Sequence, residues 1–150
     1  MLRGKLVNFG TLCNCYIIPK DFANSTAFIL YKDKNMIKRI DVSHRFSEVA
    51  IYNGVAYLAG QVPTDASKNA YEQTKQVLGE IDKFLAKAGT DKSQILMATV
   101  YLANMGNYIE MNRAWDEWVA ENNAPPRAAI EARLADPNWK VEIVVTAAVK

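Results

Sequence analysis

Three polar side chains stand in apolar surroundings and could carry chemistry: Arg127, Glu142 and Asn112. Arg127 follows Pro125 and Pro126, which restrict the backbone, and it begins a run of small and apolar residues. A rigidly held arginine at the start of a strand suits bidentate capture of a carboxylate or phosphate. It equally suits a surface ion pair, and the sequence leaves both interpretations open.

Glu142 and Asn112 each interrupt an apolar pattern. Glu142 lies within the run Val141 to Val145, where an unpaired buried carboxylate would be costly, so it is either an arginine's structural partner or an acid/base. Asn112 lies at helical spacing between Tyr108 and Trp115, which puts its amide on or beside an apolar stripe. It either hydrogen-bonds a loop carbonyl or orients a ligand.

Cysteine and histidine offer little chemistry. Cys13 and Cys15 lie near the start of the chain, one residue apart, which is a poor spacing for a disulfide or a zinc site. His44, the only histidine, lies in a polar stretch and is interpreted as a surface loop residue. A Cys/His metal site, a Ser-His-Asp triad and a Cys-His dyad are thus nearly excluded, so no metal is expected. Glu131 and Arg133 are interpreted as a solvated charge pair.

Composition indicates a soluble globular protein with one domain, since 150 residues with 50% hydrophobic and 23% charged content can bury one core. Five basic and two acidic residues give residues 1–35 a charge of +3, so the total of +2 leaves −1 for residues 36–150. A nucleic-acid partner is therefore not expected, because it would require a clustered basic face. No apolar run approaches the ~20 residues of a membrane span, and a cytoplasmic location is expected.

Residues 1–35 have no periodicity and are interpreted as an irregular or disordered extension. A start assigned upstream of a native initiator at Met36 would explain them equally well. A transit peptide is the weaker alternative, because this segment has one arginine and two aspartates.

After residue 35, alternating and helical periodicities predict an α+β fold. An Asn-Gly turn joins the second and third strands, and Gly89 is expected to end the first helix. The predicted strands are 37–42, 48–53, 55–59, 95–103, 127–133 and 139–148, and the predicted helices are about 67–88 and 107–121.

Two helices can cover only one face of a six-stranded sheet. The predicted strand 95–103 is largely apolar on both alternating sets, so the second face also needs a partner. The sequence therefore predicts an oligomer whose subunits pack their sheets together.

Several blocks together resemble the Rid (YjgF) family over residues 36–150. They are Gly60-Gln61-Val62-Pro63, Thr99-Val100-Tyr101-Leu102, the helix with Asn112, Pro126-Arg127-Ala128-Ala129-Ile130-Glu131-Ala132 and Lys140-Val141-Glu142-Ile143. The resemblance implies a chorismate-mutase-like α+β fold with a six-stranded mixed sheet and two helices on one face. It also implies a homotrimer with three clefts between subunits. Members of this family hydrolyse reactive 2-imino acids and enamines to 2-keto acids and ammonia without a cofactor.

The resemblance also implies roles for individual residues. Arg127 matches the arginine that holds the substrate carboxylate, and Glu142 matches the glutamate that orients or activates water. Asn112 matches the asparagine that lines the cleft, and Gly60 the glycine whose backbone approaches the ligand. Two substrate-binding positions depart from the deaminase pattern, because Phe46 replaces a tyrosine and Ala129 replaces a cysteine.

Three functions remain in competition at this stage. The first is a 2-imino acid/enamine deaminase, and the second is a trimeric sensor that binds a small 2-keto acid or similar carboxylate without turnover. The resemblance supports the first, and the departures at Phe46 and Ala129 keep the second open. The third is a ribonuclease or translation inhibitor, as some relatives are labelled, and the charge of −1 argues against it.

Overall fold

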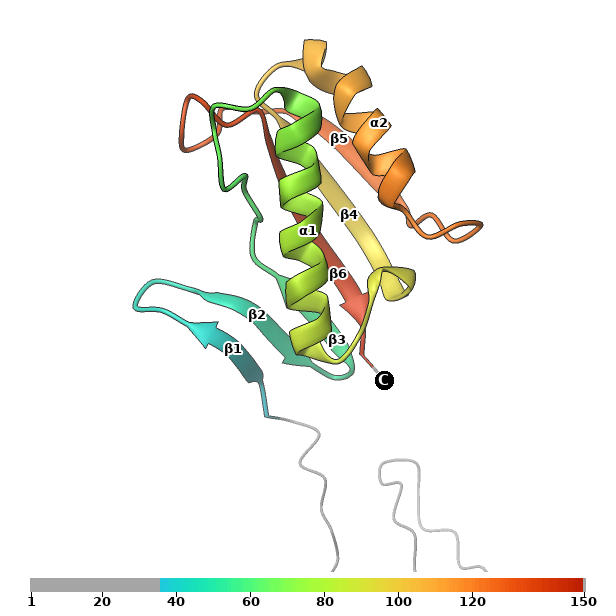
Figure 1. The fold of residues 1–150 in the computed structure, drawn as a ribbon. Coiled ribbons are helices and arrows are strands. Elements are labelled where there is room, and N and C mark those ends of the chain that lie inside the picture. The colour runs from blue at the N-terminus through green and yellow to red at the C-terminus, as the bar shows by residue number, and fades with distance from the viewer. Residues whose placement is uncertain (1–35, 150) are drawn as a thin grey trace, which may run out of the picture. The chain divides into compact units, whose positions relative to one another are not determined.

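Alternating strands and amphipathic helices make up most of residues 36–149, which this computed structural model describes (Figure 1). The extension expected for residues 1–35 lies outside the described residues. Short 3-10 turns, η1 (Lys92–Gln94) and η2 (Met105–Asn107), precede β4 and α2. The longer elements are β1 (Lys38–Val42), β2 (Ser47–Tyr52), β3 (Val55–Leu58), α1 (Ala70–Ala88), β4 (Ile95–Leu102), α2 (Tyr108–Trp118), β5 (Arg127–Glu131) and β6 (Val141–Ala148).

The strands form one mixed sheet in the order β1-β2-β3-β6-β4-β5. Only the β4–β5 pair is parallel, and the other neighbouring pairs are antiparallel. The predicted hairpin turn between β2 and β3 is confirmed, with Asn53 at φ 50° and Gly54 at φ 76°. Positive φ at both positions is the geometry that an Asn-Gly turn provides without strain.

Both helices lie on one face of the sheet, as predicted (Figure 1). β6 shows why, because its residues alternate strictly between buried and half-buried. Its buried set, Val141, Ile143, Val145 and Ala147, packs with the apolar stripe of α1 and with Met111 and Trp115 of α2.

The opposite face of the sheet, called here the open face, is not covered by residues 36–149. Thr99 and Tyr101 of β4 are half-buried, and Met97 beside them is 40% exposed. Tyr57 of β3 and Ile130 of β5 are exposed as well. The expectation that β4 is buried on both faces is therefore not met within a single chain, since only the face towards the helices is covered.

Several element ends differ from the sequence prediction for local reasons. α1 begins at Ala70 rather than near residue 67, because the Asn69 side chain accepts a hydrogen bond from Glu72 N and caps the helix. α2 ends at Trp118 rather than at residue 121, since Val119 leaves the helical conformation at ψ 146°. β5 ends at Glu131, and β6 begins at Val141 instead of residue 139.

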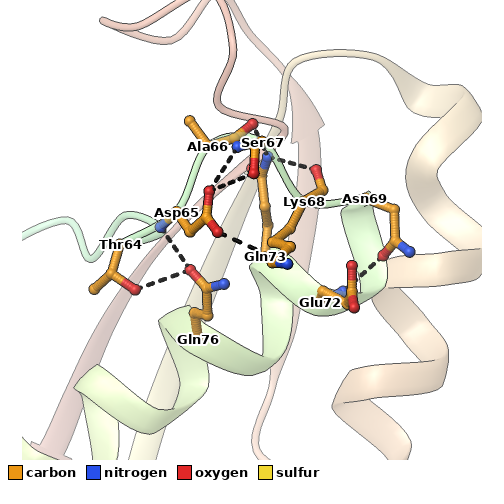
Figure 2. A network of polar contacts seen from close by, with 9 residues as sticks. All are labelled: Thr64, Asp65, Ala66, Ser67, Lys68, Asn69, Glu72, Gln73 and Gln76. Atoms are coloured by element: carbon orange, nitrogen blue, oxygen red, sulfur yellow. Dashed lines mark hydrogen bonds and ion pairs between the residues drawn. The ribbon is translucent and has the colours of Figure 1, made fainter.

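A fully buried glutamine, Gln73, joins two loops to α1. Its amide nitrogen lies 3.0 Å from Ala66 O and 2.9 Å from Lys68 O, in the loop before the helix (Figure 2). The same nitrogen lies 3.2 Å from Asn138 O, and Gln73 Oε1 accepts a hydrogen bond from Lys140 N at 2.8 Å. Gln73 therefore ties the loop after β3 to the segment that leads into β6. The helical pattern in the sequence did not distinguish it.

The same loop contains a local turn centred on Asp65 (Figure 2). Its carboxylate accepts hydrogen bonds from the hydroxyl and the backbone N–H of Ser67, which hold the pKa of Asp65 below its usual value. Asp65 N and the Thr64 hydroxyl both donate to Gln76 Oε1. These contacts fix the path of the chain between β3 and α1.

Replacing Gln73 with Met should destabilise the fold while keeping the side-chain volume. The change leaves Lys140 N and three carbonyls without the amide, and we expect a loss of roughly 2–4 kcal/mol in the free energy of unfolding. Denaturant unfolding at fixed protein concentration measures it. The matched variant is Gln76→Met, at a half-buried position of α1 whose side chain contacts the same loop. It should cost about 1 kcal/mol or less. An unchanged midpoint for Gln73→Met would refute the role of this residue.

Candidate functional site

Arg127 opens β5 and points towards α2. Its Nη2 donates to Oδ1 of Asn112 at 2.7 Å, and Nη1 lies 3.9 Å from the Met111 sulfur. The guanidinium carbon lies 4.7 Å from the ring centroid of Trp115, which is almost fully buried. Backbone geometry on β5 and three side chains of α2 together hold this cation in place.

No carboxylate neutralises Arg127 within residues 36–149, where its contacts are an amide, a thioether and an aromatic ring. The side chain is half-buried, and its planar fork has five N–H donors, most of them unused. The interpretation of Arg127 as a surface ion pair is therefore wrong for the described residues. A half-buried arginine held by neutral groups can receive an anionic ligand through two parallel charge-assisted hydrogen bonds.

Gly60 and Glu142 form a second group. The loop after β3 is joined to β6 by two backbone hydrogen bonds, Gln61 N to Ile143 O at 2.9 Å and Ile143 N to Gln61 O at 3.0 Å. These bonds place Gly60 directly beneath the Glu142 carboxylate. A Cβ atom at position 60 would overlap Oε1 of Glu142 and lie 2.9 Å from its Cδ, so only glycine leaves room for this arrangement.

Glu142 has no hydrogen bond or ion pair within the part of the chain that the structure describes, so it is not the structural partner of Arg127. The strand register explains the separation. Arg127 is paired with Ala98 of β4, which faces the helices, whereas Glu142 is paired with Tyr101 on the open face. Because paired residues project from the same face of a sheet, the Arg127 and Glu142 side chains leave the sheet on opposite faces.

The two groups are also separated within the plane of the sheet. β4 lies between β5 and β6, so these strands are about 10 Å apart. Ala98 and Tyr101 are three residues apart on β4, which adds about 10 Å along the strand. The structure thus brings Arg127 together with Asn112, and Gly60 together with Glu142, but it does not join the two pairs within one chain.

Ala129 and Phe46 lie apart from each other. Ala129 lies two residues after Arg127 on β5 and therefore projects from the same face. It is paired with Val100 and packs against the core on the helix-covered face. Phe46 lies in the turn between β1 and β2, where the Ser43 hydroxyl accepts hydrogen bonds from the backbone N–H groups of Arg45 and Phe46. The Phe46 side chain is 55% exposed.

The sequence analysis used Trp115 only to mark the apolar stripe beside Asn112 and missed its contact with Arg127. Its ring is buried, yet one face of it supports the Arg127 guanidinium. Helical spacing from Asn112 was the available signal, because residues three apart lie on neighbouring parts of a helix surface.

The predicted charge pair of Glu131 and Arg133 is wrong. Glu131 instead accepts a hydrogen bond from Met105 N at 2.8 Å and holds η2 in place.

Metal-binding clusters of three or more His, Cys, Asp or Glu side chains are not found among residues 36–149. Neither α1 nor α2 combines the length and the hydropathy that a membrane-spanning helix needs. The candidate site therefore consists of one cation, one carboxylate, one amide and the backbone at a glycine.

Comparison with known sequences gives consistent results. Residues 36–149 match the family model described as Endoribonuclease L-PSP. A RutC family protein from Haemophilus ducreyi is 82% identical over 114 residues, which cover 76% of this chain and 97% of that protein. The RutC family protein YoaB from Escherichia coli is 45% identical over 113 residues, covering 75% of this chain and 98% of YoaB.

Comparison with solved structures agrees with the sequence matches. A member of the YjgF protein family from Neisseria meningitidis superposes with a TM-score of 0.76 at 45% identity, covering 78% of this chain and 98% of its own. The expected chorismate-mutase-like α+β fold is thereby confirmed. The chain belongs to the endoribonuclease L-PSP family, the same group that the names of its relatives call RutC and YjgF, and its resemblance to the Rid proteins is confirmed.

Proposed function

We propose that this protein hydrolyses reactive 2-imino acids and enamines to 2-keto acids and ammonia without a cofactor. The observation that carries the proposal is the half-buried Arg127, held by Asn112, Met111 and Trp115 with no carboxylate partner among residues 36–149. Such a cation suits a small carboxylate ligand. Membership of the YjgF family supports the same assignment.

The separation of the two residue pairs supports a site that is assembled between copies of the chain. A small imino acid cannot span the ~14 Å and the opposite faces that separate the Arg127 and Glu142 backbones within one subunit. One copy would therefore supply Arg127 and Asn112, and its neighbour Gly60 and Glu142. A head-to-tail contact of this kind closes into a ring, and we propose a homotrimer with three such sites.

The chemistry requires only positioning and proton transfer. Arg127 holds the carboxylate, and the oxygen of a water held by Glu142 bonds to C2 while the C=N electron pair moves to nitrogen. Glu142 accepts the water's proton and passes it to that nitrogen, which gives a carbinolamine. Glu142 then transfers the hydroxyl proton to the amine, the C–N bond breaks, and the 2-keto acid and ammonia leave.

Binding of a 2-keto acid without turnover is the second candidate. It is favoured by the groups at two positions, because Ala129 offers only a methyl group packed on the core and Phe46 has no hydroxyl. The same Arg127 would serve either function. Turnover of imino acids that an amino-acid oxidase generates in a coupled assay separates the two.

Replacing Arg127 with Ala should lower kcat/KM by roughly 30-fold to several thousand-fold, since a buried charge-assisted contact is worth about 2–5 kcal/mol. Arg127→Lys should also be poor, because an ammonium keeps the charge without the planar fork. The control Arg133→Ala, at an exposed arginine beyond the same strand, should behave as wild type in the coupled assay. Near-normal hydrolysis and keto-acid affinity in Arg127→Ala would eliminate both candidate functions.

A mixture of two inactive variants tests whether the site lies between subunits. Glu142→Gln keeps the side-chain size but removes the basic carboxylate, so on its own it should abolish most turnover. Co-expressed with Arg127→Ala in equal amounts, it should restore about one quarter of the wild-type activity, because that fraction of sites in random trimers combines both intact residues. Light scattering should return a trimer. No recovery in confirmed mixed trimers would place both residues in one subunit.

Replacing Gly60 with Ala should reduce turnover more than stability. The new methyl group meets the flexible end of Glu142, which can swing aside at little cost but then leaves its working position. We expect kcat to fall about 10- to 100-fold while the melting temperature changes little. The control Gly79→Ala, on the exposed surface of α1 with nothing within 4 Å, should keep full activity and gain ~0.5–1 kcal/mol of stability. Equal activity in the two variants would contradict the tight fit at Gly60.

A further inference from the structure

Tyr101 is the cross-strand neighbour of Glu142 on β4. The two residues are directly paired between β4 and β6, and both project from the open face. Side chains opposite each other in an antiparallel pair have Cβ atoms about 4.5–5.5 Å apart. A phenol hydroxyl and a carboxylate are therefore close neighbours on this face.

Glu142 is flanked on its other side by Gly60. The carboxylate lies against this glycine, whose loop is bonded to β6 on the edge that β4 does not occupy. It therefore leans away from β4. On the open face, Glu142 therefore has Gly60 on one side and Tyr101 on the other.

Neither the Tyr101 hydroxyl nor the Glu142 carboxylate has a hydrogen-bond partner within residues 36–149. Their neighbours on the open face, Val144 and Ile130 among them, are mainly apolar. When another copy of the chain covers this face, both polar groups lose contact with bulk water, and each needs a partner to offset its desolvation. A ligand and its attacking water bound beside Glu142 and Tyr101 would supply those partners.

We propose that Tyr101 is a further substrate-contacting residue, whose hydroxyl donates a hydrogen bond to the imine nitrogen of the bound 2-imino acid. This inference rests on the proposed function. The nitrogen gains electron density as water adds to C2, so a donor placed there binds the transition state more tightly than the substrate. No proton leaves the phenol, and Glu142 remains the proton carrier.

The substitution Tyr101→Phe tests the proposal by removing one oxygen atom. Because this hydroxyl has no partner in the fold, the melting temperature and the oligomeric state should not change. We expect kcat for imino-acid hydrolysis to fall roughly 10- to 100-fold, with KM within about threefold of wild type. The matched control is Tyr57→Phe, which removes a hydroxyl from the same face. Tyr57 is paired with Thr146, four residues along β6 from Glu142, so its activity should be unchanged.

A binding measurement separates failure of this inference from failure of the proposed function. The carbonyl oxygen of 2-oxobutanoate accepts the same hydrogen bond, so calorimetric titration should show about 5- to 10-fold weaker binding to Tyr101→Phe and no change for Tyr57→Phe. If the wild type binds 2-oxobutanoate but hydrolyses no imino acid, the proposed hydrolysis is refuted. Weaker binding of 2-oxobutanoate to Tyr101→Phe than to the wild type would still support the hydrogen bond from Tyr101. The proposed role of Tyr101 would be overturned if Tyr101→Phe kept the wild-type kcat and affinity. Equal losses of kcat and affinity in Tyr101→Phe and Tyr57→Phe would also overturn it.

Discussion

The strict alternation of side chains along β6 is the constraint on which the rest of the arrangement depends. Val141, Ile143 and Val145 are committed to the core under the two helices, so Glu142 between them must stand on the other face. Because paired residues on neighbouring strands project from the same face, the strand register then determines which residues of β4 and β5 face the helices. The faces from which Glu142, Tyr101 and Arg127 project follow from this single two-residue period.

The polar groups of the candidate site are supported by different parts of the fold. Arg127 depends on α2, which supplies an amide, a sulfur atom and an aromatic face from one helical surface. Glu142 depends on the backbone, because the bridge between Gln61 and Ile143 holds Gly60 close to it. Gln73 stabilises the approach to both strands involved in that bridge by fixing two loops on α1. A change in the packing of α2 would therefore affect the Arg127 cation without moving the Glu142 carboxylate.

The sequence predicted the element order, the covered face and the chemically important residue types, because hydrophobic periodicity and turn residues are local signals. It did not predict that Arg127 and Glu142 leave opposite faces, since that depends on the register of both strands against β4. Gln73 was missed for a related reason. The sequence does not distinguish a buried glutamine from an exposed one in a helix. The hydrogen-bond partners of Gln73 at residues 138 and 140 are also distant in the chain.

The outer edge of the sheet has its own consequence for association. Among residues 36–149, β1 is an edge strand. Asp41 in it adopts φ 50°, and the ladder has no pair between Ile40–Val49 and Val42–Ser47. The Asp41 carboxylate also forms an ion pair with Lys87 of α1. A distorted, charged edge is a poor template for adding a strand from another molecule. This protein is thereby protected from open-ended fibrillar growth along β1, while broad face-to-face contacts stay available.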